Sequence, residues 1–261
     1  MTNQSITKEL KNGVATLTLN RPEVFNSFNK EMAFLLQDEL DACEKDDSVR
    51  AIILTGNGKA FCAGQDIGEI TNPDLNPGFK KILDDHYNPI VTRIRKIEKP
   101  IICGVNGVAA GAGANIALAC DVVIASDRAS FIQAFSKIGL IPDSAGTFFL
   151  PRLIGFGKAS AIMMLGDKIS AEQAEHMGMI YSVVSAETLQ EEVSAKAMTL
   201  ANMPTKALGL TKRLLNESMT NDLESQLKLE SKLQIESAST EDYAEGVAAF
   251  VEKRKPVFKG K

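Results

Sequence analysis

Asp143 is the only carboxylate in the largely apolar stretch of residues 136–155. A lone carboxylate in such a place has two common uses. It can cap the N-terminus of a helix by accepting hydrogen bonds from free backbone N–H groups. It can also carry protons, because apolar neighbours such as Ile141, Phe148 and Phe149 desolvate the carboxylate and raise its pKa toward neutrality. The stretch by itself leaves both roles open.

Two glycine-rich turns suggest a second kind of chemistry. They are FCAGQDI at residues 61–67 and GVAAGAGANIA at residues 107–117, and each follows a predicted strand and precedes a predicted helix. Glycine lets the backbone approach a ligand closely, and a helix N-terminus presents unpaired N–H groups. Two such sets of N–H groups aimed at one point would hold a developing oxyanion. Tight packing of helices against a sheet explains the same small residues equally well.

The sequence offers little support for a nucleotide or metal site. Gly111 and Gly113 begin a G-x-G pattern, but Ile116 stands where the dinucleotide-binding motif has its third glycine. The segment GNGK at residues 56–59 is too short for a phosphate-binding loop. Four cysteines without C-x-x-C spacing, together with only two histidines, predict reduced and mostly buried thiols and no metal site.

Composition and charge favour a soluble enzyme-sized domain. The chain has 261 residues, is 44% hydrophobic and 24% charged, and carries a formal net charge of −4, so neither nucleic acid nor a membrane surface is an expected partner. The N-terminus lacks the apolar segment of a secretory signal, which favours the cytoplasm. Residues 101–120 are uncharged and long enough to span a membrane. Their Gly and Ala content, with Asn106 and Asn115, instead predicts buried core.

Strands and helices alternate along the first two thirds of the chain. Two strands at residues 6–10 and 14–19 flank an Asn-Gly pair, which predicts a hairpin. A helix with Ser27 or Asn29 as N-cap follows. The further strands expected are residues 50–58, 100–106 and 121–126, and the further helices are residues 79–97 and 114–120. This alternation predicts an α/β fold with parallel pairing.

The last third of the chain reads as helical. Ser170 and Gln173 form a capping box, and Gly178 is placed to end the helix that contains His176. From residue 189 to residue 250 the pattern is amphipathic and helical. We therefore predict an α/β core at residues 1–195 that contains the site, and a C-terminal helical region at residues 196–261.

Several motifs, taken together, resemble one family. They occur in the family's order along nearly the whole chain and read NRPEVFNSF, FCAGQD, VNGVAAGAGANIALACD, IGLIPDSAGT and EGVAAFVEKRKPVFKGK. They are similar to the crotonase (enoyl-CoA hydratase/isomerase) superfamily, and most resemble its isomerases that act on the ring 1,2-epoxide of phenylacetyl-CoA in bacteria. The resemblance implies a ββα spiral core, a C-terminal helical trimerisation region, and hence a homotrimer or a dimer of trimers.

The resemblance also implies where an acyl-CoA thioester would bind. By position, the backbone N–H groups of Ala63 and Ala112 would hold the thioester oxygen, although the family usually has glycine at the second position. The residues placed around the coenzyme A moiety are Val24, Phe25, Gly64, Gln65, Asp66, Ile67, Phe250 and Lys253. Five basic residues against one acid within residues 252–261 suit a phosphate-bearing ligand, although a solvated helix end would look the same.

Two acids of the family's hydratases are missing. The glutamates that activate water and protonate carbon would fall at Asn115 and Phe135, and neither residue exchanges protons near neutral pH. Asp143 matches the aspartate of certain family isomerases. We expect Phe135 to shape an apolar slot and Asn115 to orient a substrate oxygen, with plain packing as the alternative. His86 and Tyr87 could line the pocket mouth, but packing at the surface or on a helix is expected instead.

These features predict an acyl-CoA isomerase with one proton-carrying acid. The expected reaction converts ring-1,2-epoxyphenylacetyl-CoA to oxepin-CoA, and the same site would shift a Δ3 double bond to Δ2 in enoyl-CoAs. No cofactor or metal is expected, because coenzyme A is part of the substrate. Two alternatives remain, an enoyl-CoA hydratase that uses Asp143 with a bound water, and a catalytically silent acyl-CoA-binding subunit.

Overall fold

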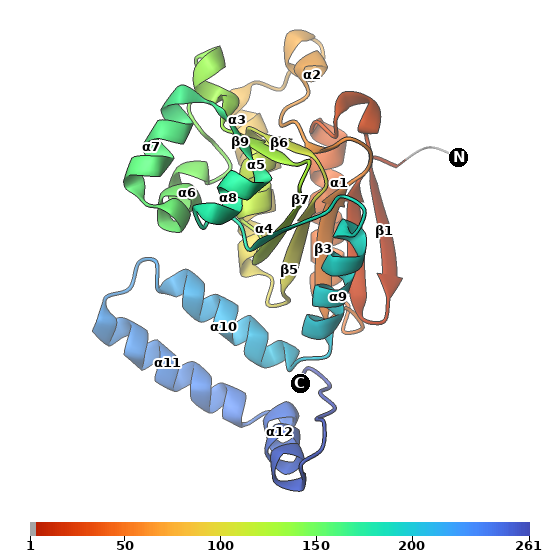
Figure 1. Ribbon diagram of the computed structural model, residues 1–261, viewed down its shortest axis with the longest axis vertical. Helices are drawn as coiled ribbons and strands as arrows, with labels where there is room; N and C mark the ends of the chain where they lie inside the picture. The colour runs from red at the N-terminus through yellow and green to blue at the C-terminus, as the bar shows by residue number, and fades with distance from the viewer. Residues whose placement is uncertain (1–3) are drawn as a thin grey trace.

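Two β-sheets lie at the centre of the computed structural model, which describes residues 4–261, and helices cover both of them (Figure 1). The larger sheet has the order β1-β2-β3-β5-β7-β10, and the smaller has the order β4-β6-β8-β9. The large-sheet strands are β1 (Ile6–Lys11), β2 (Val14–Leu19), β3 (Ala51–Gly56), β5 (Ile101–Val105), β7 (Val122–Ser126) and β10 (Ser182–Val184). The small-sheet strands are β4 (Ala60–Cys62), β6 (Val108–Ala110), β8 (Ser130–Ile132) and β9 (Lys168–Ser170).

The chain winds through the two sheets in a repeated order. A strand of the large sheet is followed by a strand of the small sheet and then by helix, as in β3–β4, β5–β6 and β7–β8. All pairs of the large sheet are parallel except β1 with β2. The predicted α/β fold with a ββα spiral and parallel pairing is therefore confirmed.

Twelve α-helices complete the part of the chain that the structure describes. Those of the core are α1 (Lys30–Lys45), α2 (Ile67–Thr71), α3 (Phe79–Lys81), α4 (Asn88–Lys96), α5 (Ala112–Leu118), α6 (Gly146–Ile154), α7 (Phe156–Leu165), α8 (Ala171–His176) and α9 (Leu189–Ala201). Three more, α10 (Thr205–Glu217), α11 (Leu223–Ala238) and α12 (Glu241–Glu252), extend away from the core (Figure 1). The predicted domain boundary at residue 195 falls within α9.

Local turn and cap chemistry fixes the ends of several elements. Asn12 and Gly13 have φ angles of 51° and 79°, which is the left-handed pair that a two-residue hairpin turn needs. Of the two candidate caps of α1, Asn29 is the one used, since its side chain accepts a hydrogen bond from Met32 N. The capping box that begins α8 is present as predicted.

The inner strands β3, β5 and β7 of the large sheet are buried on both faces, so their alternate residues face different helices. In β3, Ile52 and Leu54 belong to the core formed with α1 and α4, whereas Ala51 and Ile53 pack with residues of α9. A continuous apolar run is what a strand covered on both faces requires. This packing holds the carboxyl ends of the strands, and the turns that follow them, in fixed positions.

The helix predicted for residues 79–97 is not regular throughout. A π-helical turn, residues 82–87, separates α3 from α4. Pro89 lacks the N–H that would bond the carbonyl of Asp85, and Gln37 Nε2 donates to that carbonyl instead, at 2.8 Å. The predicted helix is thus present over residues 79–96, and only its hydrogen-bond pattern changes at the π-helical turn, which the sequence did not predict.

Residues 101–120 form β5, β6 and α5, as a buried core segment should. Within residues 4–261, no helix is both long and apolar enough to cross a membrane. The four cysteines are free thiols and all are buried, as predicted from their spacing.

Candidate active site

The two glycine-rich turns meet at the N-terminus of α5. A methyl group in place of the Gly64 hydrogen would lie 3.1 Å from Ala110 O and 3.7 Å from Ala112 N. A methyl group on Gly113 would lie 2.4 Å from Cys62 O. The first turn of α5 is therefore pressed against the end of β4, and only glycine at these positions allows so close an approach.

The N–H groups at this junction differ in their partners. Ala63 N–H donates to Phe25 O at 3.0 Å, so it is not free for a ligand. The N–H groups of Gln65 and Ala112 make no hydrogen bond with any residue between 4 and 261. This corrects the prediction that Ala63 is a donor, because Phe25 already uses its N–H. The two free N–H groups belong to Gln65 and Ala112.

The segment just before α1, where Phe28 forms an isolated bridge with Gln65, explains which N–H groups are free. Phe28 N–H donates to Gly64 O at 2.7 Å, and Asp66 N–H donates to Phe28 O at 2.8 Å. These two bonds bracket Gln65 and leave its own N–H unused. In an extended strand Ala63 and Gln65 would point their N–H groups the same way. The φ of 97° at Gly64 turns the chain between them.

Asp143 lies just before α6 and does not cap it. The residue that precedes the helix is Ala145, and no side chain caps the first turn. Ser144 Oγ donates to Asp143 Oδ1 at 2.9 Å, and no other side chain between residues 4 and 261 donates to this carboxylate. Burial raises the pKa of Asp143 to about 6. Of the two roles suggested by the sequence, the helix cap is wrong and the proton carrier remains.

The expected source of that burial is only partly correct. Ile141 is 83% exposed, so it contributes little to desolvating Asp143. Phe149 is buried, and Phe148 packs edge-to-face on it with 5.1 Å between ring centroids. The burial that raises the pKa of Asp143 therefore does not come from Ile141.

Asn115 holds Asp143 by its backbone. Asn115 Nδ2 donates to Asp143 O at 2.8 Å, and Gln133 Nε2 donates to Asn115 Oδ1 at 2.7 Å. A methyl group on Gly146 would lie 2.3 Å from Asn115 Nδ2, so the amide is also packed tightly. The sequence predicted that Asn115 orients a substrate oxygen. In the structure both of its polar atoms are bonded within the protein, and the side chain ties α5 to the Asp143 turn.

Phe135 lies beside the second glycine turn. It is buried, and its Cζ would lie 3.7 Å from a methyl group placed on Gly111. The ring therefore flanks the residue just before the free N–H of Ala112. Its proposed part in an apolar slot stays a prediction.

The other carboxylates nearby are fully engaged. Asp66 forms an ion pair with Arg21 at 2.8 Å and caps α2 by accepting from Gly68 N. Glu69 accepts from Lys30 N through Oε1 and from Gln65 Nε2 through Oε2. Asp143 is thus the one carboxylate of this region whose second oxygen has no partner among the described residues.

The residues expected around the coenzyme A moiety separate into two groups. Phe25, which follows Val24, accepts from Ala63 N close to residues 65–67, and Phe25 and Ile67 are 52% and 60% exposed. Phe250 and Lys253 lie at α12, at the opposite end of the molecule from α2 (Figure 1). Within one chain the structure therefore does not bring them to this site.

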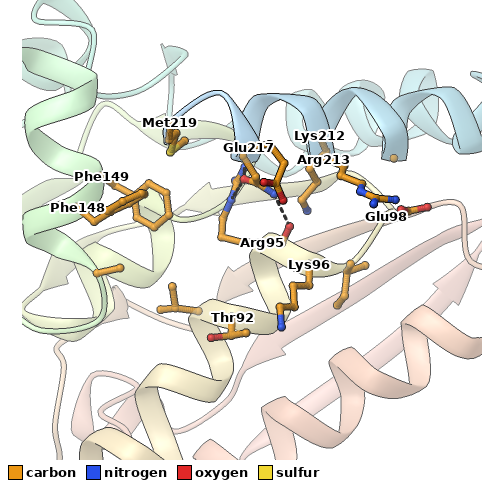
Figure 2. Close-up of a pocket in the computed structure, with 15 residues that line it drawn as sticks. Thr92, Arg95, Lys96, Glu98, Phe148, Phe149, Lys212, Arg213, Glu217 and Met219 are labelled. Carbon is orange, nitrogen blue, oxygen red and sulfur yellow. Dashed lines mark hydrogen bonds between the residues drawn. The ribbon is translucent and has the colours of Figure 1, made fainter. Parts of the chain in front are cut away.

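A separate cavity of about 580 Å³ lies between α4, α6 and α10. Figure 2 shows Phe148 and Phe149 on one side of it and Arg95, Lys96 and Lys212 on the other. Half-buried Arg95 and buried Lys212 are compensated by Asp121, the residue before β7, with which both form ion pairs. Neither the glycine turns nor the unpaired carboxylate lines this cavity, so the chemistry is not located there.

His86 and Tyr87, which follow the loop of residues 71–78, are both buried. His86 packs edge-to-face on Phe34, and burial lowers the pKa of His86. Tyr87 donates its hydroxyl to Gln65 Oε1 at 2.8 Å. The expectation of packing is confirmed for both, but the hydrogen bond of Tyr87 to the site was not predicted. His176 ends α8, as expected.

The sequence matches the enoyl-CoA hydratase/isomerase family over residues 9–261. It is 49% identical over 259 residues to the 1,2-epoxyphenylacetyl-CoA isomerase of Escherichia coli K12, covering 98% of each chain. It is 42% identical over 261 residues to a Rhodobacter capsulatus protein named as a probable enoyl-CoA hydratase, covering 100% of each chain.

Solved structures of the same family have the same fold. The enoyl-CoA hydratase from Bacillus anthracis superposes with a TM-score of 0.92 at 32% sequence identity, covering 99% of this chain and 100% of that chain. The relatives thus include proteins named for isomerisation and proteins named for hydration. The names of the relatives therefore do not distinguish isomerisation from hydration for this chain, and only its own residues can.

Proposed function

The chain belongs to the enoyl-CoA hydratase/isomerase family, and on this basis we propose that it is an acyl-CoA isomerase whose single proton carrier is Asp143. One observation carries the proposal. The site offers one carboxylate without a complete set of partners, whereas the positions of the two hydratase glutamates hold Asn115 and Phe135. Adding water across a double bond needs both a base and an acid, but moving a proton between two carbons needs only one group that takes and returns it.

The proposed mechanism begins at the thioester. The free N–H groups of Gln65 and Ala112 donate to the thioester oxygen, which stabilises the enolate that forms when the α-proton leaves. Asp143 takes that proton as a carboxylate. In a 3-enoyl-CoA the same proton returns to C4, so that the double bond moves from C3–C4 to C2–C3 with no atom gained or lost. A base with a pKa of about 6 is suited to this exchange near neutral pH.

The proposed preferred substrate is the ring 1,2-epoxide of phenylacetyl-CoA, with an oxepin-CoA as product. Support comes from the 49% identity to the Escherichia coli protein named for this epoxide. Support also comes from the buried ring of Phe135 beside the second glycine turn, which offers an apolar wall to a cyclic acyl group. The conversion is an isomerisation, so it too requires neither water nor a redox partner.

The test is to incubate the wild-type protein in deuterated buffer with three substrates and to follow products by mass spectrometry. The substrates are the ring epoxide of phenylacetyl-CoA, a 3-enoyl-CoA and crotonyl-CoA. We expect oxepin-CoA and 2-enoyl-CoA to form and crotonyl-CoA to remain unhydrated. Efficient hydration of crotonyl-CoA would favour the hydratase, and coenzyme A thioester binding without any product would favour a silent binding subunit.

Asn115→Glu is expected not to create a hydratase. The longer acid has no donor for Asp143 O, and its charge would lie next to the carboxylate that it should assist. We expect isomerisation to fall by about 10- to 100-fold, because the Asp143 turn loses its tether and shifts. The readouts are loss of 2-enoyl-CoA formation and no change in the crotonyl-CoA absorbance.

Asn115→Asp is the matched variant, since it adds an acid as Asn115→Glu does but keeps the length and shape of the side chain, and it too removes the donor to Asp143 O. It should lose isomerase activity to a similar extent. Hydration of crotonyl-CoA by Asn115→Glu, with isomerisation kept at the wild-type rate, would contradict a tethering role for the hydrogen bond between Asn115 and Asp143.

We also propose that the C-terminal helices pack against other copies of the chain. Apolar side chains on α11, α12 and the segment that follows are exposed, and they are Leu223, Leu227, Ile235, Tyr243, Val247, Phe250, Val251 and Val257. Such a patch marks an interaction surface. In such an assembly, Phe250 and Lys253 of one copy would lie near the coenzyme A site of a neighbouring copy.

Light scattering would test this assembly. The wild type is expected at about three or six times the chain mass of 28.2 kDa. Phe250→Asp, at a side chain that is 86% exposed, should shift the protein toward smaller species. A wild-type mass of one chain would contradict the proposal.

A further inference from the structure

Tyr87 lies behind the first glycine turn and is one of the largest fully buried side chains of the protein. Its ring packs edge-to-face on Phe28, with 5.9 Å between centroids. It is the last residue of the π-helical turn before α4, a rare conformation that is often found at functional sites. Its hydroxyl has one partner, Gln65 Oε1, at 2.8 Å.

The Gln65 side chain is held at both ends of its amide. Tyr87 donates to Oε1, and Nε2 donates to Glu69 Oε2 at 2.7 Å. Glu69 is itself buried and is fixed through Oε1 by Lys30 N, also at 2.7 Å. The Gln65 amide is half-buried, and with both polar atoms bonded it is held in one conformation, because breaking either bond has a cost in free energy.

Phe28 connects this side-chain network to the backbone of the same residue. It brackets Gln65 with its own N–H and C=O, and its ring supports the Tyr87 ring. The backbone and the side chain of Gln65 are thus fixed from the same side, while its N–H faces away and has no partner among residues 4–261. This is the arrangement that a preorganised donor requires.

We propose that Tyr87 is a positioning residue for the isomerisation, which through its hydrogen bond to the Gln65 side chain holds the Gln65 N–H in line with the thioester oxygen. The proposal rests on the proposed function, in which that N–H is one of two oxyanion donors. Tyr87 itself does not contact the reacting atoms in this role.

The hydroxyl of Tyr87 is suited to be a permanent donor. Burial raises the pKa of Tyr87 well above its usual value, and the negative charges of nearby acids, including Asp143 and Glu69, raise it further. The hydroxyl therefore keeps its proton throughout the working pH range. It supplies a fixed hydrogen bond and does not exchange protons with the substrate.

The experiment measures how strongly the thioester carbonyl is polarised, using phenylacetyl-CoA labelled with carbon-13 at that carbonyl. Difference infrared spectra of the bound ligand are compared for the wild type and Tyr87→Phe, which keeps the ring and its contact with Phe28. We expect the carbonyl band to shift to lower frequency in the wild type and to return toward its free position in Tyr87→Phe. In turnover of a 3-enoyl-CoA, kcat should fall by about 10- to 100-fold.

A merely structural role would not produce this pattern. KM should change by less than about threefold, because only the transition-state contact is weakened. Gln65→Met keeps the backbone N–H but removes the amide, so it should lose as much kcat as Tyr87→Phe. The double variant should lose no more than either single variant, since both break the same link. Tyr181→Phe, at an exposed tyrosine, is the matched control and should match the wild type.

Two results would overturn the inference. If the wild type shifts the carbonyl band and Tyr87→Phe shifts it equally, with unchanged kcat, Tyr87 does not position the donor, whatever its effect on the unfolding temperature. If the wild type itself binds the ligand without any band shift, the oxyanion site and the proposed function fail together with it. The wild-type spectrum therefore distinguishes the two failures.

Discussion

Asp143→Asn is expected to lower kcat for isomerisation by about 10³-fold while leaving KM within about threefold of the wild type. The amide has nearly the shape of the carboxylate but cannot take the α-proton. It can still accept from Ser144 Oγ, as Asp143 Oδ1 does, so the turn before α6 should stay in place. The measurement is the steady-state rate of 2-enoyl-CoA formation, with exchange of the α-proton for deuterium as a second readout.

The pH profile separates a base from a merely structural carboxylate. Because burial raises the pKa of Asp143 to about 6, kcat/KM of the wild type should fall tenfold per pH unit below about pH 6 and be level above it. The residual activity of Asp143→Asn should not show this step. Asp167→Asn removes an exposed carboxylate after α7 and should behave as the wild type. Wild-type activity in Asp143→Asn would move the search for the base elsewhere.

Ionisation of the Asp143 carboxyl group should lower the free energy of unfolding of the protein. Its pKa is about 6 in the folded protein, against an ordinary value of 3.8 in the unfolded chain. As the pH rises from about 4 to about 6, the unfolded chain ionises first, so the free energy of unfolding of the wild type falls across that window. Above it, Asp143→Asn should be more stable than the wild type by about 3 kcal/mol. Below about pH 4 the two should be equal, since both side chains are then neutral.

Much of the fold follows from local sequence signals. The Asn12-Gly13 pair fixes a hairpin because both residues tolerate left-handed φ, and Ser170 with Gln173 fixes a helix start because each bonds the other's backbone. The alternation of strands and helices determines the parallel large sheet, because parallel strands need a crossover between them. These features depend on contacts within a few residues, which a single sequence displays.

The details of the site depend on contacts between distant segments, and the sequence does not display them. Ala63 is excluded as an oxyanion donor only because Phe25 accepts its N–H, and nothing in the FCAGQD motif reveals that bond. Ile141 reads as an apolar neighbour of Asp143 but points into solvent. The sequence suggests only that Tyr87 packs on a helix. In the structure its hydroxyl donates a hydrogen bond to Gln65, and Tyr87 lies at the end of the π-helical turn before Pro89.

The oxyanion donor Gln65 and the proton carrier Asp143 are positioned in a similar way, by hydrogen bonds from buried side chains. Asn115 and Gln133 fix the backbone of Asp143 from α5, and Tyr87 with Glu69 fixes Gln65 from the other side. Each clamp holds an amide, Asn115 or Gln65, and the one acid that takes part, Glu69, has both of its oxygens bonded. This explains how the site keeps a single proton carrier with buried polar groups around it, since an amide stays neutral at every working pH.

Gly113→Ala is expected to disrupt both halves together, because Gly113 sets the distance between them. Its added methyl would lie 2.4 Å from Cys62 O and 2.7 Å from Cys62 Sγ, so α5 must move away from β4. We expect a loss of about 3 kcal/mol in the free energy of unfolding, from overpacking. This corresponds to a drop of about 6–12 °C in the unfolding midpoint. Below that midpoint, kcat should still be reduced by about 100-fold, since Ala112 N–H and the Asn115 tether both move with α5.

Gly157→Ala is the matched control, because a methyl group at that position of α7 meets nothing within 4 Å. It should leave kcat unchanged and stabilise the helix by up to about 1 kcal/mol. Cys62→Ala added to Gly113→Ala should recover only part of the loss, because it removes the sulfur and leaves the closer backbone oxygen in place. Wild-type kcat and midpoint in Gly113→Ala would mean that α5 and β4 can separate without cost, and that the spacing of the two turns is not what positions the donors.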